Sequence, residues 1–386
     1  MGDLIVSGAV LRWARESFGV NVSEAADLAH ASITSIESWE GGRSTPTVSE
    51  LKRLASAYRR QLATLLLRDP PTEDEPHLPD FRRRTDYTPP RVSPGVHLAI
   101  REVRRQQLAL AQVAPALGLK ALPVGSAQPR DPEGLANAWR ERLGVSVDSQ
   151  TRWRDTAAAL RAWRDLVEAA GSIVLQLKIG DEGIRGFSVV QALVPAIALS
   201  TDDSNAGRIF TLFHELAHLL IGEVGICQPG SALRYEPMAL AEERFCNRFA
   251  GAFLVPLDVL VQLEEARKLA AMPALPSEAD FGPLKRVFKV SSQVLWYRLR
   301  DADLIKGDRY LGLWSLWASQ SPSPRSLFGR SQDRPHRAIS QYGRRFVSSI
   351  LEAEGRGYIG FGDVLNYTRV RADEVRKLAS LAAGED

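Results

Sequence analysis

Residues 210–220 read FTLFHELAHLL, an H-E-x-x-H motif within an apolar stretch of helical character. Four residues advance a helix by about one turn, so His214 and His218 are expected on the same helix face. Two imidazoles placed in this way can bind one Zn²⁺. Glu215 follows the first histidine, where it can accept a proton from water that the metal activates. The motif therefore predicts a helix that carries most of a zinc site.

The apolar neighbours of the motif strengthen this prediction. Burying two histidines and one glutamate among them costs free energy unless something pairs with these groups, and a metal ion would do so. The alternative is a chance match, with ordinary hydrogen-bonded histidines in a core. Because the chain has only 6 histidines in 386 residues, a chance H-E-x-x-H is rare.

A zinc peptidase also needs a third protein ligand and an open fourth position. Glu243 and Asn247 are four residues apart on an expected helix over 237–255, so Glu243 can bind the metal while Asn247 hydrogen-bonds a ligand and fixes its orientation. Glu242 is the competing ligand, and Glu223 is a more remote one. Cys246 is better interpreted as a small buried thiol than as a ligand.

These segments carry H-E-x-x-H from His214, then E-x-x-x-N-x-F-A from Glu243 to Ala250, and a proline at position 256. The pattern resembles the ImmA/IrrE family of metallopeptidases, strongly over 196–256 and more weakly over 97–320. The resemblance implies Zn²⁺ as cofactor, His214, His218 and Glu243 as its ligands, and Glu215 as the catalytic base of peptide hydrolysis. Cys246 stands where the family commonly has alanine, and both residues are small.

Residues 9–66 resemble a second family, the XRE or lambda-repressor-like helix-turn-helix proteins. The resemblance rests on the apolar spacing of three segments, which read LRWARE from Leu11, AADLA from Ala25 and ITSIESWEGG from Ile33. It implies that residues 33–40 form a recognition helix, which in such proteins lies in the DNA major groove. The residues expected to contact DNA are Thr34, Ser35, Ser38 and Arg43.

The chemistry of this segment also permits a different role. Base readout favours Arg, Lys, Asn and Gln, and the exposed positions of the expected recognition helix carry none of them. Residues 1–65 hold seven Lys and Arg against seven Asp and Glu, so little affinity is gained from phosphate neutralisation. A protein-docking or dimerisation module is therefore the alternative to DNA binding.

The chain is expected to divide into four parts. They are a helix-turn-helix domain over 1–69, a proline-rich linker over 70–95, a metallopeptidase domain over 96–320, and a mainly helical C-terminal region over 321–386. Strands are expected at 172–177, 187–190 and 196–199, with a further strand at 310–317. The fold class is then α+β and predominantly helical, with a gluzincin-like domain built on a small sheet. An edge strand within 187–199 would bind substrate by strand addition. No internal repeat is evident in the sequence.

Composition places the protein in the cytoplasm. Hydrophobic residues make up 45%, charged residues 25%, and the formal net charge is +3, the balance of an ordinary globular protein. No apolar run is long enough for a membrane helix, and the N-terminus lacks a signal peptide. The two cysteines, Cys227 and Cys246, fit a reducing compartment.

Three functions remain open. The first is a zinc metalloendopeptidase that cleaves a specific partner protein, a transcriptional repressor or antitoxin, in a regulatory, stress or mobile-element pathway. The second is a DNA-binding transcriptional regulator that uses the metallopeptidase fold as a sensor or scaffold. The third is the toxin-type protease of a toxin–antitoxin pair. The presence of Glu215 favours the first and third, because a scaffold has no need of the base.

Overall fold

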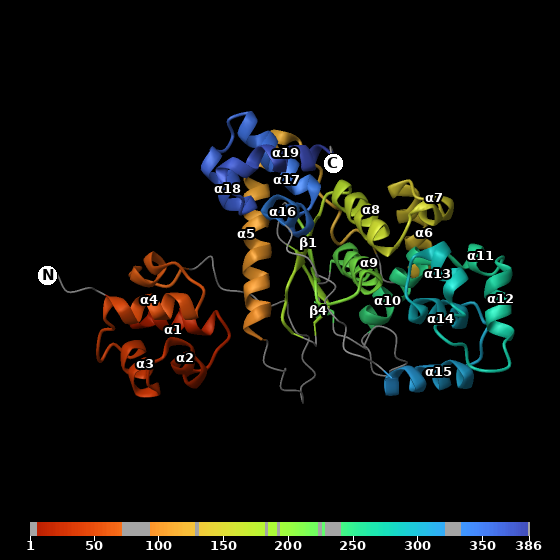
Figure 1. Ribbon diagram of the computed structural model, residues 1–386, viewed down its shortest axis with the longest axis horizontal. Helices are drawn as coiled ribbons and strands as arrows, with labels where there is room; N and C mark the ends of the chain where they lie inside the picture. The colour runs from red at the N-terminus through yellow and green to blue at the C-terminus, as the bar shows by residue number, and fades with distance from the viewer. Residues whose placement is uncertain are drawn as a thin grey trace. The chain divides into compact units, whose positions relative to one another are not determined.

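The computed structural model describes residues 6–71, 93–127, 131–181, 184–190, 194–222, 226–227, 241–320 and 333–384. The chain forms two compact units, Met1–Glu102 and Val103–Asp386. The described residues are mostly helical and include one small sheet, which confirms the predicted fold class (Figure 1). Within these residues, every helix is too short or too polar to cross a lipid bilayer.

The N-terminal unit is a cluster of short helices around one apolar core. Its elements are α1 (Gly8–Glu16), α2 (Val22–Ala29), α3 (Ile33–Glu40), α4 (Val48–Ala57), the 3₁₀ helix η1 (Leu62–Leu66) and the start of α5 (Pro94–Leu117). Capping boxes begin α2 and α4, and the side chain of Ser32 caps α3. The core residues include Val10, Ile36, Trp39, Leu51 and Leu65.

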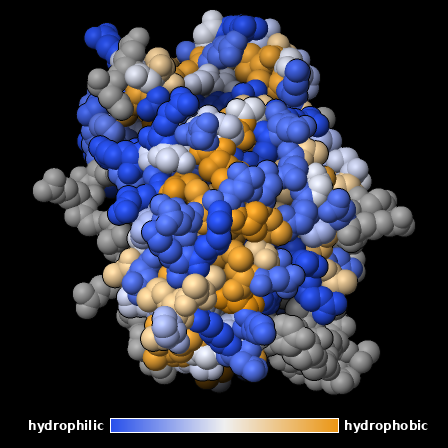
Figure 2. Space-filling view, turned by 90° about the vertical axis from the view of Figure 1, so that its right-hand side faces the viewer, coloured by the Kyte–Doolittle hydropathy of each residue, from blue (hydrophilic) through white to orange (hydrophobic). Residues whose placement is uncertain are grey.

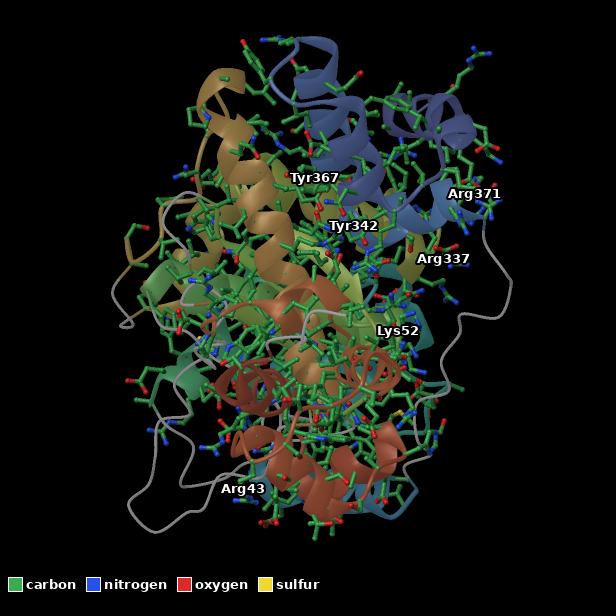
Figure 3. All side chains as sticks on the ribbon, turned by 90° about the vertical axis from the view of Figure 1, so that its left-hand side faces the viewer. Arg43, Lys52, Arg337, Tyr342, Tyr367 and Arg371 are labelled. Atoms are coloured by element: carbon green, nitrogen blue, oxygen red, sulfur yellow. The ribbon has the colours of Figure 1, made fainter. Side chains whose placement is uncertain are left out.

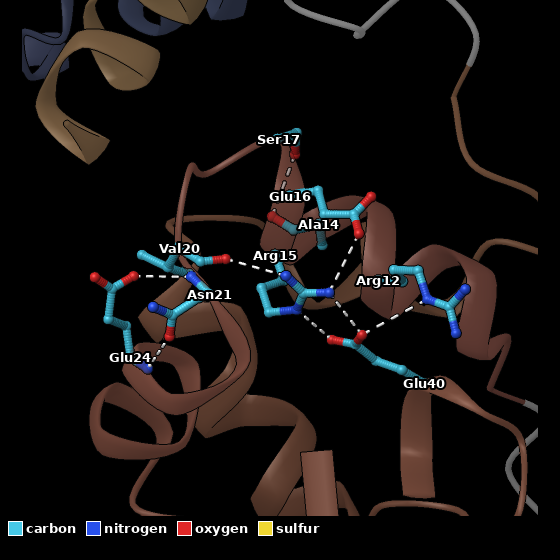
Figure 4. Close-up of polar contacts among 9 residues, drawn as sticks. All are labelled: Arg12, Ala14, Arg15, Glu16, Ser17, Val20, Asn21, Glu24 and Glu40. Carbon is cyan, nitrogen blue, oxygen red and sulfur yellow. Dashed lines mark hydrogen bonds and ion pairs between the residues drawn. The ribbon is translucent and has the colours of Figure 1, made fainter. Parts of the chain in front are cut away.

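A buried ion pair ties α1 to the end of α3 (Figure 4). Arg15 Nε donates to Glu40 Oε1 at 2.7 Å and its Nη2 to Oε2 at 2.9 Å, while Nη1 reaches the carbonyl oxygen of Val20 at 3.1 Å. The hydrogen bond to Glu40 raises the pKa of Arg15, although burial acts in the opposite direction. Because both charged groups are hydrogen-bonded, the pair fixes the end of α3 against α1.

The second unit is built around a four-stranded sheet in the order β1-β3-β2-β4. Its strands are β1 (Ile173–Leu177), β2 (Gly186–Val189), β3 (Ala196–Ser200) and β4 (Ile226–Cys227). β1 runs parallel to β3, whereas β2 runs antiparallel to both β3 and β4. The expectation of an edge strand within 187–199 is therefore wrong, because β2 and β3 are interior strands and the edges are β1 and β4.

Two of the helices that precede and follow the strands cover the sheet, and others pack on helices around them (Figure 1). These helices are α6 (Pro132–Leu143), α7 (Val147–Arg152), α8 (Thr156–Ala169), α9 (Asn205–Ile221) and α10 (Ala241–Leu254). α8 packs against β1, and α9 packs against β2 and β3. Gln107 of α5 donates hydrogen bonds to the carbonyl oxygens of Val189 at 3.2 Å and Val194 at 2.7 Å. The sheet is thus held between elements that precede and follow it.

A helical lobe follows α10 and includes one corrected prediction. It consists of α11 (Leu257–Leu260), α12 (Glu264–Ala271), α13 (Gly282–Phe288), α14 (Ser292–Asp301) and α15 (Gly307–Gln320). The strand expected at 310–317 is part of α15, where Tyr310, Leu313 and Trp317 recur at helical spacing toward the core. Leu275 and Leu311 are more than two-fifths exposed, and Figure 2 shows apolar surface on this side of the molecule.

Residues 333–384 form a set of short helices. It contains α16 (Arg334–Tyr342), α17 (Arg344–Gly355), α18 (Phe361–Thr368), the 3₁₀ helix η3 (Ala372–Glu374) and α19 (Val375–Ala383). α16 is attached to the sheet by Arg164 of α8, whose Nη1 and Nη2 donate to the carbonyl oxygens of Ser340 at 2.6 Å and Gln341 at 3.1 Å. Arg164 Nε also binds Glu168 Oε1 at 2.9 Å in a fully buried pair. Since Arg164 Nη2 also donates to the carbonyl oxygen of Val174 in β1, one guanidinium joins α8, α16 and the sheet.

Replacing Arg164 with methionine is expected to reduce the free energy of unfolding by about 3–5 kcal/mol, because the Glu168 carboxylate loses its buried partner. Urea denaturation followed by tryptophan fluorescence would measure the loss. Arg161→Met, an exposed site on the same helix, is the matched control and should have little effect.

The loss of stability in Arg164→Met should also depend on pH. Burial raises the pKa of Glu168 to about 7, even with Arg164 beside it. Without Arg164 this carboxyl binds its proton more tightly in the folded than in the unfolded chain, so stability falls as pH rises. The defect of Arg164→Met should therefore be larger at about pH 8 than at about pH 5. An equal loss at both would contradict a charge-based cause.

Candidate metal centre

Helix α9 can approach the sheet closely because β2 begins with a glycine. A Cβ atom at Gly186 would lie 2.5 Å from Thr211 Cγ2 and 2.7 Å from the carbonyl oxygen of Ala198, so a side chain has no room there. Thr211 and Glu215 are one turn apart and share the α9 face that contacts the sheet. The close approach therefore brings Glu215 near β2, in which Ser188 lies two residues after Gly186.

An aromatic cluster sets the position of α10 against α9. The rings of Phe213 and Phe253 stack with centroids 4.0 Å apart and an interplanar angle of 21°. Trp163 of α8 meets Phe213 edge to face at 5.0 Å and Phe253 at 5.4 Å. All three side chains are fully buried. Since Phe213 immediately precedes His214, this packing fixes the position along α9 at which α10 makes contact.

The C-terminal end of α10 is held by three buried side chains from other helices. Arg140 Nη1 donates to the carbonyl oxygen of Phe253 at 2.6 Å, Gln150 Nε2 to that of Leu254 at 3.0 Å, and Arg298 Nε to that of Val255 at 3.0 Å. The last carbonyl groups of a helix have no partner within it, so these donors satisfy atoms that would otherwise be buried alone. They leave α10 little freedom to slide along α9.

This framework brings His214, His218 and Glu243 together. The two Nε2 atoms are 3.1 Å apart. Glu243 Oε2 lies 3.5 Å from His214 Nε2, and Oε1 lies 3.2 Å from His218 Nε2. Although burial by itself raises the pKa of the Glu243 carboxyl, the two imidazoles lower it well below its usual range. Among the described residues, these three form the one cluster of at least three potential metal ligands.

The spacing fits a tetrahedral ion. Ligands bound at 2.0–2.1 Å in a tetrahedron are about 3.3 Å from one another. The two imidazole nitrogens are 3.1 Å apart, and the Glu243 oxygen nearest to each lies at 3.5 and 3.2 Å. Hydrogen bonding within the described part of the chain does not account for the buried Nδ1 atoms of both histidines or for Oδ1 of Asn247. A donor set of two nitrogens and one carboxylate is typical of catalytic zinc, which keeps an open position.

Glu215 lies beside this cluster in a fully buried position. Burial raises the pKa of Glu215 to about 7, while the neighbouring His218 and the Ser188 hydroxyl lower it by less. Its carboxylate oxygens have no close hydrogen-bond partner among the described residues. Ser188 was not among the residues predicted from sequence, although a polar residue within the apolar strand FSVV was a signal that could have indicated it.

The structure also shows where most of the other candidate ligands and their neighbours lie. Asn247 is buried one turn after Glu243, whereas Cys246 is buried and is not part of the ligand cluster. Glu242 is half-buried and likewise lies outside the cluster. Glu223 and the expected helix start at 237 fall outside the described residues. The carboxylate that the structure places with the histidines is that of Glu243.

The predicted DNA-contact residues lie on α3 and in the turn after it. Thr34 and Arg43 are exposed, and Ser35 and Ser38 are partly exposed. Their hydroxyls form a local network, in which Ser32 Oγ lies 2.8 Å from both Thr34 Oγ1 and Ser35 Oγ. Arg43 and Lys52 extend from the surface of this unit (Figure 3). The exposed side of α3 thus offers hydroxyl groups and Glu37, with Arg43 in the turn that follows the helix.

Two family models match the chain. Residues 167–300 match the IrrE N-terminal-like domain of a peptidase family, and residues 8–66 match a helix-turn-helix domain. No curated protein and no solved structure is significantly similar to the chain. The first match contains α9, α10 and all three clustered ligands, and the second contains α1 to α4. The chain therefore has the architecture of an ImmA/IrrE-type peptidase domain preceded by an N-terminal helix-turn-helix domain.

Proposed function

We propose that the protein is a zinc-dependent endopeptidase whose metal is held by His214, His218 and Glu243. The observation that carries this proposal is the cluster of two imidazole nitrogens and one carboxylate at tetrahedral spacing. The match of residues 167–300 to a peptidase family supports it independently. Zn²⁺ bound there would polarise a peptide carbonyl and make water acidic enough to attack near neutral pH.

The residues of the chain then have separate roles. Glu215, with a pKa of about 7, can accept a proton from the attacking water and pass it to the leaving amine. The neighbouring Ser188 hydroxyl lowers the pKa of Glu215 and so favours its carboxylate form, and Asn247 orients a metal ligand from the α10 side. The imidazoles and Glu243 leave a fourth position for the substrate. The arrangement supports hydrolysis of peptide bonds by general-base catalysis.

The proposed substrate is a specific partner protein, of the transcriptional repressor or antitoxin kind, in a regulatory, stress or mobile-element pathway. The fusion of the peptidase domain to a helix-turn-helix domain supports this, because such domains act in transcription. A toxin-type protease of a toxin–antitoxin pair would use the same site. A regulator that keeps the peptidase fold only as a scaffold would have no need of a buried, unpaired Glu215.

Purified protein is expected to contain about one zinc ion per chain, and His218→Ala should lose most of it, because one of three protein ligands is removed. Elemental analysis after dialysis measures the zinc content of the parent protein and of the variant. His336→Ala, at a half-exposed histidine on α16, is the matched control and should keep its zinc. Full zinc retention in His218→Ala would place the metal elsewhere.

Glu215→Gln is expected to keep the zinc and to lower cleavage by about 10²–10⁴-fold, because the amide cannot accept the proton. The readout is the fragment pattern of a co-expressed repressor encoded by a neighbouring gene. Glu242→Gln, which neutralises a carboxylate outside the cluster, should cleave normally. Unchanged cleavage by Glu215→Gln would show that another group is the base.

We propose DNA as a second partner, bound through α3 and Arg43. The match of residues 8–66 to a helix-turn-helix domain supports this. In a gel shift on the promoter of its own operon, Arg43→Gln should weaken binding several-fold and reduce its salt dependence, because one cation near the phosphates is lost. If the parent protein gives no salt-dependent shift, the domain is instead a docking or dimerisation module.

A further inference from the structure

A narrow pocket lies within the second unit, between α5, the start of β1 and α17. Its walls are mostly apolar, and the residues that form them are Leu110, Ala114, Leu119, Ile173, Val194 and Phe346. With its open mouth the pocket encloses about 390 Å³, but its inner part has room for only about one or two water-sized groups. His214, His218 and Glu243 do not line it, so the pocket is separate from the candidate metal centre.

Two glycines fix the walls of this pocket. At Gly171 (φ 109°), which follows α8, a Cβ atom would clash with the carbonyl oxygen of Lys120. The N–H of Leu122 donates to the Gly171 carbonyl oxygen at 3.0 Å, so the chain after α5 is joined to the chain before β1. At Gly343 (φ 89°), which precedes α17, a Cβ atom would clash with Glu168 Oε1. Because backbone segments meet closely on both sides, the pocket is already formed in the protein without a ligand.

A buried carboxylate lines this pocket. Glu168 is only 1% exposed, and its Oε1 accepts a hydrogen bond from Arg164 Nε at 2.9 Å. Its Oε2 has no hydrogen-bond partner among the described residues. Leaving a buried carboxylate oxygen without a donor is unfavourable, so a donor that enters the pocket would gain from pairing with it. The pocket thus offers a hydrogen-bond acceptor inside apolar walls.

The mouth of the pocket is basic. Lys120 and Arg345 also line it, and both side chains are exposed, which places them at its open side. Among the lining residues, Glu168 is the only acid, and it is already paired with Arg164. The charges around the pocket therefore favour a ligand that carries a negative group at its outer end. A guanidinium and an ammonium group are both suited to a carboxylate.

We propose that this pocket binds a small, unbranched molecule with a hydrogen-bond donor at one end and a carboxylate at the other. The donor, an amine or a hydroxyl, pairs with Glu168 Oε2, and the carboxylate pairs with Lys120 and Arg345. The chain between them packs on the apolar walls, whose narrow spacing excludes branched molecules. The alternative occupant is a water molecule at Oε2, which predicts no affinity for such ligands.

The test uses ω-amino acids with chains of about four to eight carbons, each compared with the plain fatty acid of the same length. Binding to the full-length protein is measured by titration calorimetry at about pH 8, above the Glu168 pKa of about 7. The best ω-amino acid is expected to bind at least about tenfold more tightly than its fatty acid, because only the former donates to the carboxylate. The matching ω-hydroxy acid then shows whether an amine or a hydroxyl is preferred.

The comparison of ligands leaves Glu168 unchanged, so its ion pair with Arg164 is not disturbed. Equal affinity for the two ligands of each pair would overturn the proposal. So would the absence of binding by every ω-amino and ω-hydroxy acid at about 20 mM, since a small ligand that fits a pocket binds more tightly than this. In that case the pocket holds water alone.

The mouth is tested with Lys120→Gln/Arg345→Gln, which should weaken binding of the best ligand by at least about tenfold. Because both side chains are exposed, the melting temperature should stay at the parent value. The matched control is Arg161→Gln/Lys178→Gln, which removes two exposed cations that do not line the pocket and should bind normally. An equal loss in this control would reduce the effect to net charge and contradict the proposed site.

A last control separates this pocket from the metal centre, because a carboxylate ligand can also bind zinc. His218→Ala, which removes one of the candidate zinc ligands, should bind the best ω-amino acid as the parent does. Loss of binding in this variant would place the ligand at the metal and overturn the proposal.

Discussion

The contact between α9 and α10 is the constraint on which the candidate metal centre depends, because the two helices supply different members of the cluster His214, His218 and Glu243. His214 and His218 are fixed relative to each other by a single helical turn, whereas Glu243 reaches them only if α10 lies at the right height. The stacked rings of Phe213 and Phe253 set that height from inside the core. An error of about 1 Å in such a contact is enough to disable a catalytic site.

Buried polar groups in this protein differ in how well they are paired. Both carboxylate oxygens of Glu40 accept hydrogen bonds from Arg15, and Glu168 Oε1 accepts one from Arg164, although Glu168 Oε2 has no hydrogen-bond partner among the described residues. The carboxylate of Glu215 and the Nδ1 atoms of the two histidines are buried without such partners in the described chain. Unsatisfied buried groups are destabilising, so a protein retains several of them around one point only where they have another use.

The clustering of His214, His218 and Glu243 could be predicted from the sequence because the information is local. The H-E-x-x-H spacing and the distance from Glu243 to Asn247 depend only on helical periodicity, which every residue of α9 and α10 obeys. The prediction of an edge strand within 187–199 was wrong for the opposite reason. Strand order is decided by pairing between residues far apart, and no local pattern shows that β2 and β3 are interior. Ser188 could not be singled out from the sequence for the same reason, because only the packing of α9 on the sheet brings it near Glu215.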